Sequence, residues 1–264
     1  MITKTRPEFI LQTSDLVKEF RGFVAVNGVN LRVRRGDIHA LIGPNGAGKT
    51  TCFNLLTQFL KPTRGQIWFN GTDITRDSPQ QIARRGIVRS FQISAVFPHL
   101  SVLDNVRVAL QRKEPTGFHF WRSGRLLDRL TPAAISVLEQ VGLQDFARTT
   151  AVELSYGRKR ALELATTLAL DPELMLLDEP TQGMGHEDVD RVMALIKKVS
   201  VNRTVLMVEH NMKIVSGICD RITVLARGAV LAEGPYAEIA AHPKVMEAYM
   251  GVSADDPLLN GAVA

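Results

Sequence analysis

Cysteine is scarce in this chain, which has two in 264 residues. Cys52 and Cys219 lie far apart and lack the short spacings that are typical of metal-binding or redox motifs. This pattern argues against a disulfide framework and against a cysteine metal site. It indicates a reducing compartment, for which the cytosol is the natural candidate.

Long apolar runs are also missing. Nowhere do about eighteen uncharged apolar residues follow one another, and the N-terminus lacks a basic segment followed by an apolar core. We therefore expect a chain that neither spans a bilayer nor is exported. Internal repeats and low-complexity segments are absent from the sequence as well. With 45% hydrophobic residues, this length predicts one large or two small globular domains.

The chain carries no strong excess of one charge, because its formal net charge is +5. This balance suits a protein that handles polyphosphate or lies near an anionic lipid surface, and by itself it does not indicate nucleic acid. Basic and aromatic side chains gather in one stretch, residues 112–129. There a solvated face is favoured over a membrane or partner patch.

What the chain does have is a glycine-rich stretch that matches G-x-x-x-x-G-K-[ST]. An apolar strand, predicted over Ile38–Ile42, runs into it and a helical pattern follows. Glycines let successive backbone N–H groups turn toward phosphates, and the helix points the positive end of its dipole at them. Lys49 can then reach the β- and γ-phosphates, while the Thr50 hydroxyl is placed to ligate Mg²⁺. The predicted nucleotide-binding residues are Gly43, Pro44, Asn45, Gly46, Ala47, Gly48, Lys49, Thr50 and Thr51.

Two adjacent carboxylates end a second buried strand, predicted over Leu174–Leu177. In an open parallel sheet the carboxyl ends of the strands border the ligand crevice, so we expect these acids to face the phosphate loop. Asp178 would hold Mg²⁺, directly or through water. Glu179 would orient or deprotonate the attacking water as general base. The alternative is an ordinary surface Asp-Glu pair at the end of a strand.

Two further polar side chains follow predicted strands. His210 comes after the apolar run 204–208, in a strand that we expect to neighbour the Asp178 strand and to place the imidazole near the γ-phosphate. Gln92 follows the strand predicted over residues 86–91 and could ligate Mg²⁺ or water. Taken alone, a histidine is more often structural than catalytic.

A second anion-binding site is predicted where Leu154-Ser155-Tyr156-Gly157-Arg158 opens a helix. The Ser155 hydroxyl and the Gly157 backbone would lie at the helix N-terminus, where anions bind. The alternative is a plain N-cap that binds nothing. The order of the motifs along the chain favours binding: phosphate loop, Gln, Ser-x-Gly, Asp-Glu, His.

With these motifs in this order, the chain resembles the ATP-binding-cassette family over about residues 11–251. The resemblance implies an α/β fold: a P-loop NTPase core with an N-terminal antiparallel β subdomain and an inserted α-helical subdomain. The matching motifs are Walker A at Gly43 to Thr51, the Q-loop at Gln92, the signature at Leu154 to Arg158, Walker B at Leu174 to Asp178 with Glu179 after it, and the H-loop at His210.

The same resemblance implies that two cassettes sandwich ATP between the Walker A motif of one and the signature of the other. Ser155 and Gly157 would then contact the ATP of a partner subunit. Adenine usually stacks on an aromatic upstream of Walker A, for which Phe20 is the best match and Phe23 the second candidate. A core position is the alternative for Phe20, because phenylalanine needs no ligand to justify burial.

Finer features resemble the larger ATPase subunit of branched-chain amino-acid importers. They are residues 18–22 and 87–92, the tyrosine of the signature, the long insert 111–130, and residues 242–251. Two positions depart from that pattern, with Arg158 where the family usually has Gln and Gly185 where it usually has Asp or Asn.

The resemblance implies a peripheral protein on the cytoplasmic side of a membrane, with ATP and Mg²⁺ as cofactors. Its implied partners are a second ATPase subunit, identical or paralogous, transmembrane permease subunits and, indirectly, a solute-binding protein. The permease would be reached through residues 93–100 and the helical insertion. Alternatives are the ATPase of a lipopolysaccharide exporter, a soluble cassette protein of translation or DNA repair, and a P-loop kinase.

We expect a single domain over residues 1–251, with a core of about 1–92 and 158–235, a helical subdomain of about 93–157 and a C-terminal helix of about 236–251. Residues 252–264 would form a loose tail. Within the domain we expect short N-terminal strands over 10–13 and 29–33, and helices over 102–170. One of these helices would start at Pro132.

Overall fold

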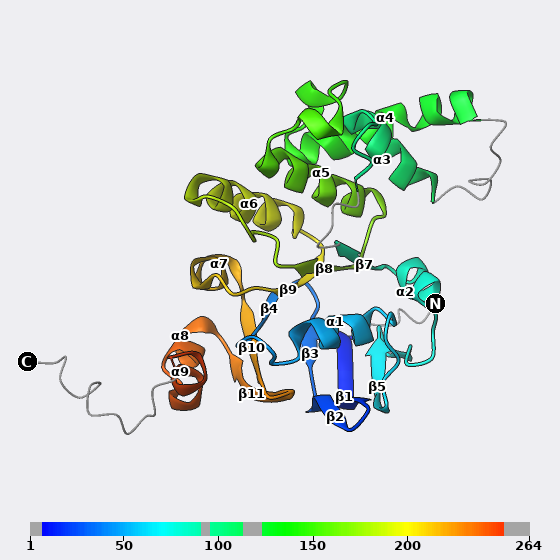
Figure 1. Ribbon diagram of the computed structural model, residues 1–264. Helices are drawn as coiled ribbons and strands as arrows, with labels where there is room; N and C mark the ends of the chain where they lie inside the picture. The colour runs from blue at the N-terminus through cyan, green and yellow to red at the C-terminus, as the bar shows by residue number, and fades with distance from the viewer. Residues whose placement is uncertain (1–6, 91–95, 113–122, 251–264) are drawn as a thin grey trace, which may run out of the picture. The chain divides into compact units, whose positions relative to one another are not determined.

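The computed structural model describes residues 7–90, 96–112 and 123–250 (Figure 1). The chain forms two compact units, residues 1–83 with 204–264, and residues 84–203. The predicted helical subdomain falls within the second unit, which also contains two strands. The narrower boundaries of about 93 and 157 stay a prediction, and Gln92 and the tail after residue 250 lie outside the described residues.

An antiparallel sheet occupies part of the first unit, with strand order β2-β1-β5-β6 and with β3 paired to β1. The strands β1 and β2 meet in a tight turn at Arg21-Gly22, where Phe20 pairs with Phe23. Both turn residues have positive φ, 48° and 89°, which matches the twist of a two-residue hairpin. The strand bounds are β1 Phe9–Phe20, β2 Phe23–Val29, β3 Arg32–Arg34, β5 Arg64–Phe69 and β6 Thr72–Asp73.

The N-terminal strands differ from the short ones that the sequence predicts. β1 runs for 12 residues, β2 is an additional strand, and the segment predicted over 29–33 is divided between β2 and β3. The reason is irregular pairing: register shifts interrupt β1 between Ser14 and Val17, and Asp15 has a φ of 47°. Such a bulge breaks the two-residue alternation from which a strand is recognised.

Three parallel strands form the other sheet of the first unit, in the order β10-β4-β9, with β11 antiparallel to β10. Every residue of β4 and β9 is buried, which explains their continuous apolar sequences. Leu41 of β4 lies opposite Val208 of β9, so these two strands end at the same edge. The bounds are β4 Ile38–Ile42, β9 Thr204–Val208, β10 Arg221–Ala226 and β11 Ala229–Gly234.

Within the described part of the chain, five helices accompany these sheets. α1 buries Cys52, Phe53, Leu55 and Leu56, and burial raises the pKa of the Cys52 thiol to about 12. A thiol with this pKa stays protonated and unreactive. The bounds are α1 Lys49–Leu56, α2 Pro79–Arg84 at the boundary between the units, α7 Met212–Ile218, α8 Tyr236–Ala240 and α9 Pro243–Met250.

The second unit combines two parallel strands with helices. Figure 1 shows α3, α4 and α5 gathered together in green, and the three contact one another pairwise. The prediction of helical structure over 102–170 is confirmed for the described residues, and two short 3₁₀ turns connect α4 to α5. The bounds are β7 Ile87–Ser90, α3 Val102–Gln111, α4 Ser123–Val141, the turns Gln144–Phe146 and Ala151–Glu153, α5 Tyr156–Ala169, β8 Leu174–Asp178 and α6 His186–Val199.

Pro132 lies inside α4, so the prediction that it starts a helix is wrong. A proline in a helix interior removes one backbone hydrogen bond. Side chains next to Pro132 contact α3, because the Arg107 guanidinium donates to the Thr131 hydroxyl and lies 3.8 Å from Asp128. Both partners belong to the helical turn before Pro132, which is thereby fixed to α3.

Among the helices of the described residues, none combines the length and apolar character needed to cross a bilayer.

One buried histidine makes the stability of the first unit sensitive to pH. His39 lies on β4 with no exposed surface, and its Nε2 is 2.8 Å from the Thr223 hydroxyl. Burial, and secondarily the positive charge of Arg221, lower the pKa of His39 from 6.5 to about 3. The folded protein therefore holds this imidazole neutral where an unfolded chain would protonate it.

We predict that His39→Gln removes part of the pH dependence of folding. Between about pH 6.5 and pH 3 the unfolded chain binds a proton that the folded protein does not. The free energy of unfolding should therefore fall by up to about 1.4 kcal/mol per pH unit as the pH decreases through this window. Urea unfolding at about pH 7 and about pH 5.5 measures this difference, which should be smaller in His39→Gln.

The exposed His186 provides a control, and His186→Gln should keep the wild-type difference between the two pH values. Equal pH dependence in the wild type and in His39→Gln would contradict the role given to the buried imidazole.

Candidate functional site

The phosphate loop passes so close to neighbouring backbone that two of its glycines cannot be replaced. Gly43 has a φ of 152°, and a Cβ at this position would lie 2.2 Å from the carbonyl oxygen of Leu225. Gly48 has a φ of 97°, and its Cβ would lie 2.4 Å from the carbonyl oxygen of Ala25. Both contacts are far below van der Waals distance. Close packing against the backbone of β10 and β2 therefore requires glycine at positions 43 and 48.

The first turn of α1 is arranged to receive an anion. Gly48 is its N-cap and has no side chain to accept the N–H groups that lack partners within a helix. No acidic residue lies in this turn, and the Thr50 side chain is exposed. The Lys49 ammonium donates to the carbonyl oxygens of Gly43 and Pro44 at 2.6 and 3.0 Å. Backbone N–H groups and a cation therefore surround the space into which phosphates are predicted to fit.

His210 follows β9 and is exposed. Because β4 and β9 are parallel neighbours, His210 and the phosphate loop leave the same edge of one sheet. Glu209, which is fully buried, accepts hydrogen bonds from the backbone N–H groups of His210 and Asn211 at 3.0 and 3.1 Å. Sequence reasoning missed Glu209, although an acid that ends a continuous apolar strand was a usable signal.

In the second unit, Asp178 ends β8 with its carboxylate buried. Oδ2 of this carboxylate is paired with the guanidinium of Arg89, which lies on the neighbouring strand β7. Their side chains are only 2% and 10% exposed. A carboxylate has two oxygens, so pairing with Arg89 leaves the chemistry for a metal ligand in place. Arg89 lies in the segment 87–92 that carries part of the family resemblance, but its pairing with Asp178 could not be predicted from the sequence.

Glu179 comes directly after Asp178 and adopts a φ of 46°, an uncommon backbone conformation for a residue with a side chain. The following turn is closed by a hydrogen bond from the Gln182 N–H to the Glu179 carbonyl oxygen, 3.1 Å. Backbone strain of this kind is concentrated at functional sites, where the surrounding structure compensates for it.

The start of α5 carries the predicted second anion site. Ser155 is the N-cap, its side chain is exposed, and it makes no capping hydrogen bond. The hydroxyl can therefore contact a ligand. Gly157 lies against α6, because a Cβ there would be 2.9 Å from an Asp188 carboxylate oxygen. The Arg158 guanidinium lies 4.0 Å from the ring centre of Phe146.

Two aromatic side chains project at the β1–β2 hairpin. Phe20 is 41% exposed and Phe23 is 67% exposed, so neither is a core residue. The Lys18 ammonium lies 5.0 Å from the ring centre of Phe20. Both rings are accessible for stacking, and contact with adenine stays a prediction for each.

The predicted metal ligands are separate oxygen donors. Among residues 7–90, 96–112 and 123–250, no three His, Cys, Asp or Glu side chains form a cluster that could hold a metal ion. Mg²⁺ needs no such cluster when phosphate oxygens and water supply most of its ligands, and it then takes one or two carboxylates. The Thr50 hydroxyl and the Asp178 carboxylate are hard oxygen donors of this type.

A family model described as ABC transporter matches residues 26–182, more than half of the chain. The chain belongs to the ABC transporter family. A second model, described as branched-chain amino acid ATP-binding cassette transporter, matches residues 229–255. Membership confirms the predicted resemblance and identifies the chain as an ATP-binding and ATP-hydrolysing subunit.

Curated relatives match over nearly their whole length. The high-affinity branched-chain amino acid transport ATP-binding protein BraF of Pseudomonas aeruginosa is 41% identical over 252 residues, which are 92% of this chain and 98% of the relative. The protein LivG of Escherichia coli, with the same description, is 40% identical over 253 residues, again 92% and 98%.

Solved structures agree with the fold. An ATP-binding cassette of an ABC transporter in its ADP conformation has a TM-score of 0.81 and 30% identity, covering 93% of this chain and all of that chain. A dimeric cassette in a post-hydrolysis state, bound to ADP and Pi, has a TM-score of 0.71 and 25% identity, with 85% and 98% covered. The predicted fold class is thereby confirmed.

We predict that Arg89→Gln destabilises the protein by about 3–5 kcal/mol, because it leaves the buried Asp178 carboxylate without its counter-ion. The free energy of urea unfolding measures this loss. Arg191→Gln is the matched control: its guanidinium is 75% exposed and pairs at 3.5–3.8 Å, so the change should stay below about 1 kcal/mol. Equal losses in both variants would refute a structural role for the buried pair.

We predict that Arg158→Gln leaves ATP hydrolysis nearly unchanged. The guanidinium is engaged with the Phe146 ring, and the ligand contacts are assigned to Ser155 and Gly157. Steady-state kcat and KM for ATP measure this outcome, with Ser155→Ala as the variant that should lose activity. A large gain or loss in Arg158→Gln would show that the arginine has a role of its own.

Proposed function

We propose that this chain hydrolyses ATP to power a membrane importer for branched-chain or related amino acids. The observation that carries this proposal is the match of residues 229–255 to the branched-chain amino acid cassette model, alongside the phosphate loop. The same match favours an importer over the ATPase of a lipopolysaccharide exporter. Family membership likewise argues against a P-loop kinase.

ATP would bind through its phosphates at the loop. The backbone N–H groups before α1 and the Lys49 ammonium supply positive charge, and the loop carbonyl oxygens that now hold Lys49 give it a defined starting position. Phe20 or Phe23, exposed at the hairpin, would stack on the adenine. Gly43, Pro44, Asn45, Gly46, Ala47, Gly48, Thr50 and Thr51 would complete the phosphate-binding loop.

Mg²⁺ would be held by Thr50 and Asp178, with Gln92 as a further ligand, and would neutralise charge on the β- and γ-phosphates. Glu179 would accept a proton from the attacking water as general base. His210 and Gln92 would orient the water and the γ-phosphate. Glu209 would help to position His210, because its carboxylate accepts hydrogen bonds from the backbone N–H groups of His210 and Asn211.

Two ATPase subunits, identical or paralogous, would form two sites, with Ser155 and Gly157 of each contacting the nucleotide held by the other. ATP would favour the closed pair and hydrolysis the open one, so the γ-phosphate acts as the ligand of the closed state. The pair would lie on the cytoplasmic face of the membrane against permease subunits. A solute-binding protein would deliver the amino acid on the other side.

We predict that Glu179→Gln binds ATP yet remains as a closed dimer, because the nucleotide is held but water is not activated. Light scattering with and without Mg-ATP measures the dimer, and phosphate release measures turnover. Lys49→Ala, which removes the phosphate-binding cation, should show neither nucleotide binding nor a dimer. Rapid turnover in Glu179→Gln would remove Glu179 from the role of base.

A further inference from the structure

Tyr156 occupies the second position of the serine-led signature segment and is the first residue of α5. Its ring is 47% exposed, and its hydroxyl donates a hydrogen bond to the carbonyl oxygen of Gln182 at 2.7 Å. Gln182 belongs to the loop between β8 and α6. The hydroxyl oxygen also lies against Gly183 of that loop, 3.6 Å from where a Cβ would be.

The same loop residue is bonded to the predicted general base. Gln182 accepts from Tyr156 through its carbonyl and donates through its N–H to the Glu179 carbonyl, at 3.1 Å. A path of two hydrogen bonds and one residue thus joins the start of α5 to the backbone of Glu179. Since Glu179 has a φ of 46°, its backbone conformation depends on restraints of this kind.

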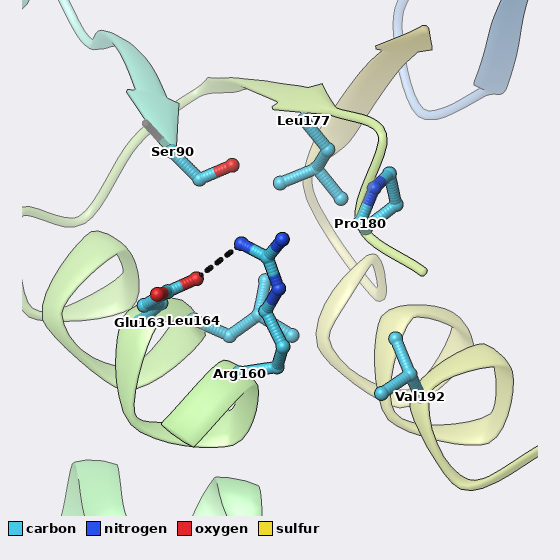
Figure 2. Close-up of a pocket in the computed structure, with 7 residues that line it drawn as sticks. All are labelled: Ser90, Arg160, Glu163, Leu164, Leu177, Pro180 and Val192. Atoms are coloured by element: carbon cyan, nitrogen blue, oxygen red, sulfur yellow. Dashed lines mark hydrogen bonds and ion pairs between the residues drawn. The ribbon is translucent and has the colours of Figure 1, made fainter. Parts of the chain in front are cut away.

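A small pocket also places α5 beside this segment. The Arg160 guanidinium pairs with Glu163 at 2.6 Å and lies 5.8 Å from the ring centre of Tyr156. Figure 2 shows Arg160 and Glu163 of α5 around a small pocket, opposite Ser90, Leu177 and Pro180. Pro180 directly follows Glu179. The first turns of α5 therefore border the segment that carries the base at two points, Pro180 and Gln182.

We propose that Tyr156 is a positioning residue that couples the serine-led start of α5 to Glu179 of the same chain. This inference rests on the proposed function, in which Ser155 and Gly157 contact the nucleotide of the partner copy. Engagement of that nucleotide fixes the start of α5, and the bond from Tyr156 to Gln182 transmits the constraint to Glu179. Each subunit thereby adjusts its own base according to the nucleotide held by its partner.

The test is Tyr156→Phe in the full-length chain, because this change removes the hydroxyl and keeps the ring over which Arg160 lies. We expect kcat for ATP to fall by about three- to tenfold, in line with the loss of one hydrogen bond, with an unchanged dissociation constant for ATP. Hydrogen exchange at the Gln182 amide should accelerate. Tyr236→Phe, also at the first position of a helix, is the matched control and should match the wild type.

The double variant Tyr156→Phe/Glu179→Gln distinguishes a role of Tyr156 in positioning Glu179 from direct contact between Tyr156 and the nucleotide. In that background Tyr156→Phe should cause no further loss of residual hydrolysis, because the group that it positions is already gone. ATP-dependent dimer formation by the double variant should equal that of Glu179→Gln. Weaker dimer formation would instead assign Tyr156 to direct nucleotide contact and overturn the proposal.

The coupling and the proposed function fail in different ways. An inactive Glu179→Gln together with wild-type kcat in Tyr156→Phe would overturn the coupling alone. Wild-type turnover in Glu179→Gln would overturn the role of the base, and the coupling with it.

Discussion

The parallel pairing of β4 with β9 and β10 is the constraint on which the first unit depends. It brings the backbone of Leu225 so near to Gly43 that no side chain fits between them, which fixes the path of the phosphate loop. It also brings β9 to the edge where the loop begins, so that His210 leaves the sheet beside it. Every residue of β4 and β9 is buried, so both faces of these two strands are covered.

Local patterns could be predicted from the sequence because local chemistry produces them. The loop glycines, the buried strands before Gly43 and Asp178, and the helix start at Ser155 each follow from a few adjacent residues. The long β1 with its irregularity at Asp15, and the continuous α4 through Pro132, depend on partners distant in the sequence. No periodicity within the segment itself could have revealed them.

The same distinction separates the site residues that the sequence pattern predicts from the contacts that support them. Arg89 precedes Asp178 by 89 positions, and Tyr156 precedes Gln182 by 26. Glu209 is adjacent to His210, but only its burial and its two backbone hydrogen bonds show that it supports the turn. These supporting contacts become visible only after the chain has folded.

The two departures from the family pattern have different local settings. The Arg158 guanidinium is stacked on the ring of Phe146, a residue of its own chain. Gly185 is the N-cap of α6, and a Cβ added to it would meet no atom of the described residues within 4 Å, so a larger residue would find no steric obstacle there. The lack of an acid at Gly185 is therefore not imposed by packing.

The buried pair of Arg89 and Asp178 has a consequence for the resting subunit. An unpaired carboxylate in the protein interior would be costly, because nothing would compensate for its lost hydration. Here the guanidinium already supplies the compensating charge from within the polypeptide. The Asp178 carboxylate is therefore neutralised by the chain itself and can stay buried without any bound cation.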